Sequence, residues 1–186
     1  MNNRQEIPLT NGHGSLRNEG LRLIRGWDDR IASQLVENSI QPEILKWTPK
    51  DHKERFSSLE AANEWHERDP HVVYALARAA ELAGVIWFTK KQTADVDANY
   101  TFAIRMYELA RGRGLSGEFA SATLGDFNET TNYQESVWLE TDTNNTVALH
   151  LYEKLGFRDV LVSDGRIKMV RERGLGHVPR PHESVK

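Results

Sequence analysis

The order of apolar and polar side chains along the chain predicts an alternation of strands and helices. Short runs rich in Val, Ile and aromatic residues are typical of strands, and apolar residues that recur every three to four positions are typical of helix faces. Strands are expected at residues 21–24, 72–79, 84–89, 100–107, 136–141, 158–162 and 166–170. Helices are expected at residues 27–36, 57–69, 117–128 and 147–155.

This order predicts one mixed α/β domain over residues 20–172, with antiparallel strands early and a β-α-β crossover in the middle. The polar residues 1–19, rich in Asn and Gly, are expected to form a disordered or loose leader, and residues 173–186 a flexible tail. Residues 41–49 are interrupted by prolines and predict a connector. Asp164-Gly165 predicts a tight hairpin turn, and Gly156 predicts the end of the last helix.

Composition narrows the class of protein. The 186 residues suit one globular domain, and the net charge of −3 provides no basic surface for nucleic acid or an anionic membrane. The absence of Cys excludes disulfides, thiolate metal sites and a cysteine nucleophile. The seven His residues are scattered without ligand-like pairing, so no metal is expected. Because the sequence has no signal peptide and no apolar stretch of membrane-spanning length, the cytoplasm is the expected location.

A glycine-rich turn at residues 111–117 (Arg-Gly-Arg-Gly-Leu-Ser-Gly) lies between a predicted strand and a predicted helix. Its backbone N–H groups and the first turn of the helix form an anion site suited to a pyrophosphate, to which the two arginines add positive charge. The alternative is a plain strand-to-helix turn with solvated arginines. The spacing also fits the G-x-G-x-x-G pattern of dinucleotide-binding oxidoreductases. Against that class, the turn is not tight and too few residues follow for a doubly wound sheet.

A second motif favours one of these interpretations. Residues 145–157 read Asn-x-x-Ala-x-x-Leu-Tyr-x-x-x-Gly-Phe, which resembles the C-terminal coenzyme A-binding motif of the GNAT acetyltransferase superfamily at every position. Upstream, Arg111-x-x-Gly114-x-Ser116 resembles the pyrophosphate-loop motif of that superfamily, with Ser where the family has Gly or Ala. Residues 138–140 and Tyr152 are most similar to the ribosomal-protein and protein N-terminal acetyltransferases.

The resemblance implies a GNAT fold, with a central mixed, mostly antiparallel sheet of six or seven strands flanked by about four helices. It implies an N-acetyltransferase that moves the acetyl group of acetyl-CoA to a primary amine by direct transfer in a ternary complex. The amine acceptor, a protein N-terminus or a small amine, is then the partner, and a homodimer agrees with family habit. The alternatives are a non-catalytic coenzyme A-binding sensor and, less favoured, an NAD(P)-dependent oxidoreductase.

The resemblance also assigns residues to the cofactor. The pantetheine arm is expected along the strand edge at Ile104, Arg105 and Met106, pairing through the backbone, with an N–H near Met106 stabilising the oxyanion. Asn145 is expected to bind the cofactor or order water, to cap its helix, or both. The pyrophosphate is expected on the turn formed by Arg111, Gly112, Arg113, Gly114, Leu115, Ser116 and Gly117.

Two side chains are expected to carry the chemistry. Glu140 is the candidate base that removes a proton from the amine, and its alternative is an exposed strand carboxylate. Tyr152 is the candidate acid that protonates the leaving thiolate, and its alternative is a half-buried helix tyrosine with a bonded hydroxyl. The acceptor pocket is expected from residues 27–70, 90–99 and 128–135, with Trp47 lining it and the other tryptophans in the core.

Overall fold

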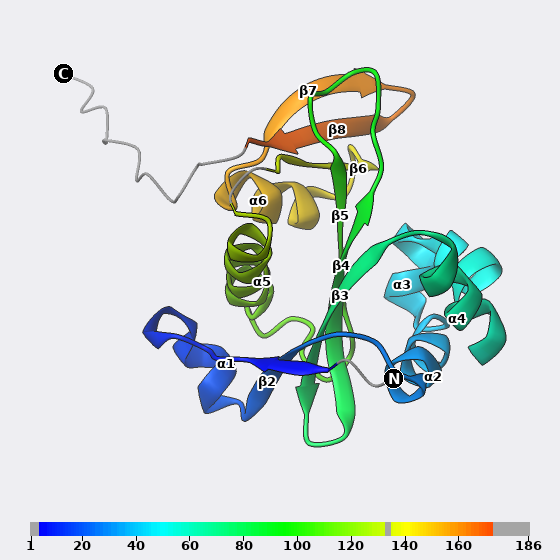
Figure 1. The fold of residues 1–186 in the computed structure, drawn as a ribbon. Helices are drawn as coiled ribbons and strands as arrows, with labels where there is room; N and C mark the ends of the chain where they lie inside the picture. The colour runs from blue at the N-terminus through cyan, green and yellow to red at the C-terminus, as the bar shows by residue number, and fades with distance from the viewer. Residues whose placement is uncertain (1–3, 133–134, 173–186) are drawn as a thin grey trace.

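In the computed structural model, which describes residues 4–132 and 135–172, an eight-stranded sheet separates two groups of helices (Figure 1). The strands are β1 (Gln5–Ile7), β2 (Leu21–Arg25), β3 (His71–Arg78), β4 (Glu81–Lys90), β5 (Tyr100–Met106), β6 (Val137–Asp142), β7 (Arg158–Ser163) and β8 (Arg166–Arg171). The α-helices are α1 (Gly14–Asn18), α2 (Asp29–Asn38), α3 (Pro42–Trp47), α4 (Leu59–Arg68), α5 (Ser116–Thr130) and α6 (Thr146–Lys154). Two short turns of other helix type are η1 (Asn11–His13) and η2 (Asp51–Arg55).

The strands lie in the order β1-β2-β3-β4-β5-β6-β8-β7, and neighbours are antiparallel except for the parallel pair β5 and β6. The predicted mixed, mostly antiparallel sheet is therefore confirmed, and β1 brings the strand count above the expected six or seven. Among the described strands this single parallel pair is incompatible with the doubly wound parallel sheet of a dinucleotide-binding oxidoreductase. That alternative is excluded by the topology.

The sheet is covered on both faces, so its central strands are apolar on both sides. In Figure 1, helices α1, α5 and α6 cover one face and helices α2, α3 and α4 the other. Successive residues of a strand point to opposite faces. On β4, Ile86 and Phe88 accordingly join the cluster beneath α5, where the ring of Phe88 stacks on Phe127 at 3.8 Å, while Val85 and Trp87 join the cluster beneath α2 and α4.

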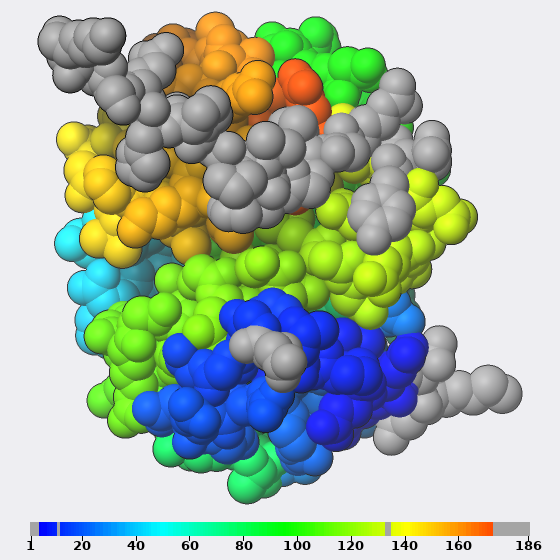
Figure 2. Space-filling view, turned by 90° about the vertical axis from the view of Figure 1, so that its left-hand side faces the viewer, coloured from blue at the N-terminus to red at the C-terminus, as the bar shows by residue number. Residues whose placement is uncertain are grey.

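The loose leader expected at residues 1–19 is wrong for the part that the structure describes. Residues 5–7 form β1, which pairs with β2, and Leu16 of α1 is fully buried. The carboxylate of Glu118 on α5 accepts hydrogen bonds from the backbone N–H groups of Ser15 and Leu16, and Figure 2 shows this blue N-terminal segment lying against the green α5. The few apolar residues of this segment follow no period, so they gave no local signal. The predicted tail at 173–186 lies outside the described residues.

The connector expected at residues 41–49 is also wrong, because residues 42–47 form α3. Pro42 occupies the first helical position, where a missing N–H group costs nothing. The Ser57-Ser58-Leu59-Glu60 segment fits a capping box with Ser57 as the N-cap of the next helix. In the structure the N-cap of α4 is Ser58, whose hydroxyl accepts a hydrogen bond from the N–H of Ala61.

Two turn predictions are confirmed by backbone angles. Asp164 and Gly165 have φ values of 51° and 72°, the left-handed pair that a tight hairpin turn requires. Gly156 has φ of 87° directly after α6, in the position that ends the helix.

Gly84 allows the closest approach between the central strands. A Cβ atom at Gly84 would lie 2.8 Å from the carbonyl oxygen of Arg105 on β5 and 3.2 Å from the ring of Phe119. We expect Gly84→Ala to lower the free energy of unfolding by about 1–3 kcal/mol, because β5 must move. Gly125→Ala is the matched control on α5: no atom lies within 4 Å of its added Cβ, so it should stabilise by up to about 1 kcal/mol. Denaturant unfolding compares the two, and equal stability would contradict the close approach.

Candidate functional site

A cavity opens where β5 and β6 separate. The two strands pair only at Tyr100–Val137 and Thr101–Trp138, and beyond these pairs they diverge. The resulting cavity has a volume of about 1370 Å³. Its lining joins the edge of β5, the glycine-rich turn, β6 and the first turns of α6, which are the segments that carry both sequence motifs.

The free edge of β5 faces this cavity through alternate residues. The N–H of Tyr107 donates to the carbonyl of Ala83 at 2.9 Å, and the carbonyl of Arg105 lies beside Gly84, so both point toward β4. Because backbone groups alternate between the two edges of a strand, the N–H and C=O groups of Ile104 and Met106 point toward the gap. The carbonyl of Ile104 accepts from Arg105 and that of Met106 from Arg111, so pairing at this edge falls to the two N–H groups. The expectation that these residues offer backbone atoms for pairing therefore agrees with the geometry.

The glycine-rich turn brings backbone N–H groups to one end of the cavity. Gly112 and Gly114 adopt φ values of 75° and 72°, which only glycine adopts without strain. The turn leads into α5, whose N-cap residue Leu115 has no side chain that could bond the first-turn N–H groups. Those N–H groups and the positive end of the helix dipole form an anion site at Ser116. Gly112, Gly114, Leu115 and Ser116 line the cavity, and Gly117 does not.

The two arginines of the turn bind different partners. The guanidinium of Arg111 donates to the carbonyl of Met106 at 2.9 Å and to the side-chain oxygen of Gln41 at 2.6 Å, so it braces the end of β5. Arg113 does not line the cavity and pairs with Glu19 at 2.6 Å near the end of α1. The expected contribution of Arg113 to the anion site is therefore not seen, because an acid from the N-terminal segment holds its side chain elsewhere.

Helix α6 presents two of the predicted residues to the cavity. Asn145 is the N-cap of α6, since its side-chain oxygen accepts the N–H of Ala148 at 3.3 Å, and it also lines the cavity. Tyr152 is 7% exposed, with its ring edge-on to Phe102 at 6.2 Å. No described residue forms a hydrogen bond with its hydroxyl, unlike the bonded tyrosine of the alternative interpretation. Burial raises the pKa of Tyr152, and the Arg105 guanidinium opposes this effect.

Glu140 lies on β6 and also lines the cavity. Its side chain is 42% exposed, and one carboxylate oxygen accepts from the guanidinium of Arg166 on β8 at 3.0 Å. The position of Glu140 in the cavity lining is consistent with the predicted base. Its ion pair with Arg166 is consistent with the alternative, an exposed strand carboxylate. The second carboxylate oxygen has no partner among residues 4–132 and 135–172.

A buried ion-pair cluster lies beside the site and has no sequence motif. Asp51 of η2 is 1% exposed and bonds Arg105 at 2.5 Å and Arg55 at 2.7 Å. Burial raises the pKa of Asp51, but the two guanidinium groups outweigh it and hold that pKa below its ordinary value. Arg105 lies over the ring of Trp87 at 4.8 Å, on the face of the sheet opposite α5. The sequence alone could not pair Asp51 with Arg105, because the two residues are 54 positions apart.

Aromatic side chains form the other wall of the cavity, on the α3–α4 face of the sheet. Trp47, predicted to line the acceptor pocket, does line the cavity, although it belongs to α3 rather than to a loop. Trp65, Trp87 and Trp138 are buried as expected for core residues, and they also line the cavity. These three tryptophans therefore belong to the core and also form part of the cavity wall.

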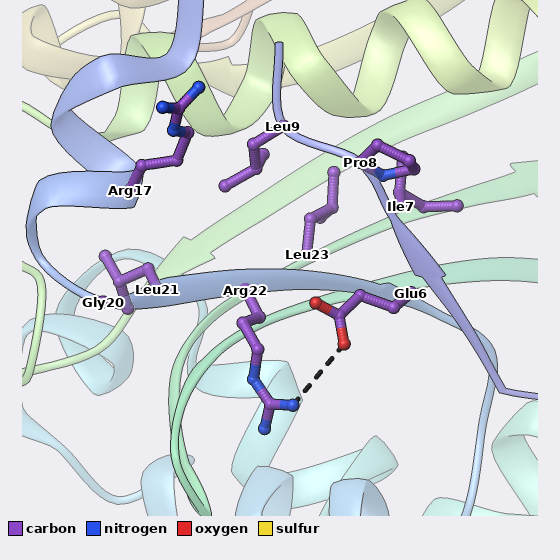
Figure 3. Close-up of a pocket in the computed structure, with 9 residues that line it drawn as sticks. All are labelled: Glu6, Ile7, Pro8, Leu9, Arg17, Gly20, Leu21, Arg22 and Leu23. Carbon is purple, nitrogen blue, oxygen red and sulfur yellow. Dashed lines mark hydrogen bonds and ion pairs between the residues drawn. The ribbon is translucent and has the colours of Figure 1, made fainter.

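A second pocket of about 340 Å³ lies between β1, α1 and β2 (Figure 3). An ion pair joins Arg22 and Glu6 at 3.5 Å across it. None of the residues predicted for the site lines this pocket, so it does not compete with the cavity between β5 and β6.

Within residues 4–132 and 135–172, no group of three or more His, Cys, Asp or Glu side chains is arranged to hold a metal ion. Within the same residues, none of the helices has the length and apolar character needed to cross a membrane.

The comparison with protein families gives one match. Residues 21–158 match the family described as an acetyltransferase (GNAT) domain. The matched segment includes the strands, the turn and the α6 motif that line the cavity. No curated protein matches the chain.

Solved structures resemble the fold at low sequence identity. A ribosomal L7/L12 alpha-N-protein acetyltransferase is 14% identical with a TM-score of 0.63, over 91% of this chain and 94% of that chain. A putative acetyltransferase from Salmonella typhimurium, solved with acetyl-CoA, is 13% identical with a TM-score of 0.65, over 87% and 98%. A spermidine N-acetyltransferase from Vibrio cholerae, in complex with CoA and spermine, is 16% identical with a TM-score of 0.64, over 84% and 97%.

Proposed function

The chain belongs to the GNAT acetyltransferase family, and from this premise we propose that it transfers the acetyl group of acetyl-CoA directly to a primary amine in a ternary complex. The observation that carries the proposal is the single cavity between β5 and β6, which joins a free strand edge, an anion-binding turn and the hydroxyl of Tyr152. The acceptor is a small amine or a protein N-terminus.

The residues present fit acetyl-CoA. The N–H groups of Ile104 and Met106 at the edge of β5 suit the carbonyls of a pantetheine arm, and the first-turn N–H groups at Ser116 suit a pyrophosphate. Gly112 and Gly114 leave open space where a side chain would otherwise stand. When bound, acetyl-CoA supplies the acetyl group as a thioester and a thiolate as leaving group.

The chain's own groups would then act at three atoms. The N–H of Met106 faces the gap and would stabilise negative charge on the acetyl oxygen. As the amine nitrogen bonds to the acetyl carbon and the carbon–sulfur bond breaks, the amine loses a proton and the thiolate gains one. Glu140 would take the first proton through its unpaired oxygen, and Tyr152 would give the second.

Binding and turnover test the proposal separately. Calorimetry of the full chain with acetyl-CoA should give saturable binding, and NAD(P) should give none. A panel of primary amines with acetyl-CoA should release free thiol, read colorimetrically. Absence of acetyl-CoA binding would refute the proposal. Binding without thiol release on any amine would instead favour the non-catalytic coenzyme A sensor.

A further inference from the structure

The cavity carries more positive than negative charge, although the whole protein has a net charge of −3. Its lining holds only three carboxylates, and two of them are neutralised, Glu140 by Arg166 and Asp69 by Arg68. The third, Glu43, has no ion-pair partner within the described residues. The cations in the lining are Lys46, Lys50, Arg55, Arg68, Lys91, Arg105, Arg111 and Arg166, of which the four arginines at 55, 68, 105 and 166 pair with carboxylates.

Asp51 lies behind this wall and offsets the charge of one of the two arginines with which it pairs. Both of its oxygens already accept from Arg55 and Arg105, and the residue is 1% exposed. Arg55 uses one guanidinium nitrogen for this bond, and its side chain is 35% exposed in the lining. The remaining N–H groups of Arg55 are therefore open to a ligand.

The aromatic wall already binds cations of the protein itself. An ammonium group binds an indole by lying over its face. The protein's own cations already lie over three of the cavity tryptophans: Arg105 over Trp87 at 4.8 Å, Lys46 over Trp47 at 4.7 Å and Lys168 over Trp138 at 5.4 Å. The fourth, Trp65, is enclosed by the rings of Trp27, Phe56, Trp87 and His71.

Part of the positive charge of the cavity lining lies far from the anion site expected to bind the cofactor. The N–H of Lys91 donates to the carbonyl of Asn99, beside the first residue of β5, whereas the glycine-rich turn follows the last residue of β5. Seven residues of strand separate the two ends, a distance of about 20 Å. Lys91 has no ion-pair partner in the described parts of the chain. The pyrophosphate site therefore does not account for this lysine.

From this charge distribution we propose that the acceptor is a small amine that also carries an anionic oxygen group, a carboxylate or a phosphonate, which Lys91 receives. The inference rests on the proposed acetyl transfer and specifies its substrate class. A polyamine would meet one unpaired carboxylate and several unpaired cations, so like-charge repulsion excludes it.

A panel of matched amines tests the charge requirement. β-Alanine, 2-aminoethylphosphonate and β-alaninamide share one two-carbon amine and end in a carboxylate, a phosphonate and a neutral amide. L-Phenylalanine and L-phenylalaninamide repeat the comparison of carboxylate and amide with an aromatic side chain. Spermidine represents the polyamines. We expect kcat/KM for at least one carboxylate or phosphonate to exceed that of its amide by 10-fold or more, with no turnover of spermidine. The better of carboxylate and phosphonate identifies the anionic group.

Adjacent lysines provide the matched variants. Lys91→Gln should raise KM for the preferred anionic amine about 10-fold while the Kd of acetyl-CoA stays unchanged. Lys90→Gln, one residue earlier and outside the cavity lining, should leave both values unchanged. Preference for an amide or spermidine, no turnover of any anionic amine, or equal effects of the two variants would overturn the inference. If the unmodified protein does not bind acetyl-CoA, the proposed function itself is refuted.

Discussion

Tyr152→Phe is expected to lower kcat by about 10²–10⁴-fold while the Kd of acetyl-CoA stays within a factor of about two to three of the unmodified protein. Tyr152 lines the cavity, and its hydroxyl has no hydrogen-bond partner among the described residues, so it is free to donate. Burial raises the pKa of Tyr152, which keeps the hydroxyl protonated through the neutral range. Steady-state thiol release and calorimetry measure the two quantities.

The same substitution should leave the fold intact. The ring of Tyr152 packs against Phe102 and Phe157, contacts that Phe would keep, and no described hydrogen bond is lost. We expect a change in unfolding free energy below about 1 kcal/mol. Tyr100→Phe is the control, since Tyr100 lies on β5 outside the cavity lining, and it should retain full kcat. Equal kcat for the two variants would remove Tyr152 from the role of acid.

Asp51→Ala is expected to lower the free energy of unfolding by about 3–5 kcal/mol, because Arg105 would be left buried without its counter-charge. Asp51 bonds Arg105 twice and ties η2 to the central strand beside the site. Urea unfolding at neutral pH measures the loss. Glu6→Ala is the control: its ion pair with Arg22 is exposed on both sides and should contribute below about 1 kcal/mol. Comparable losses for the two variants would contradict a special role for the buried cluster.

Acid titration adds an independent readout of this cluster. The folded-state pKa of Asp51 is below its ordinary value, so its contribution to stability is fully present above about pH 4 and is lost as the pH falls through the folded pKa. The unmodified protein should therefore lose unfolding free energy more steeply below pH 4 than Asp51→Asn, which cannot titrate there. Parallel pH profiles for the two proteins would contradict the lowered pKa.

Local patterns in the sequence were sufficient for most of the fold. Strand and helix periods predicted seven of the strands and the larger helices, since each period reflects one buried face. Glycines at 112, 114, 156 and 165 were recognisable as turns, because their left-handed backbone favours glycine. The motifs at 111–117 and 145–157 indicated the family, which the match over residues 21–158 shows.

What the sequence alone determined, then, is the order of the longer strands and helices, the family and the segments that carry both motifs, because each depends on neighbouring residues. Only the tertiary structure decided which charged groups meet. It directs Arg111 to the end of β5 and Arg113 to Glu19, and buries Asp51 against Arg105. It also pairs residues 5–7 with β2, holds residues 15–16 against α5 and leaves Lys91 without an ion-pair partner in the described chain. Partners far apart in sequence carry no local period, so only the folded chain brings them within bonding distance.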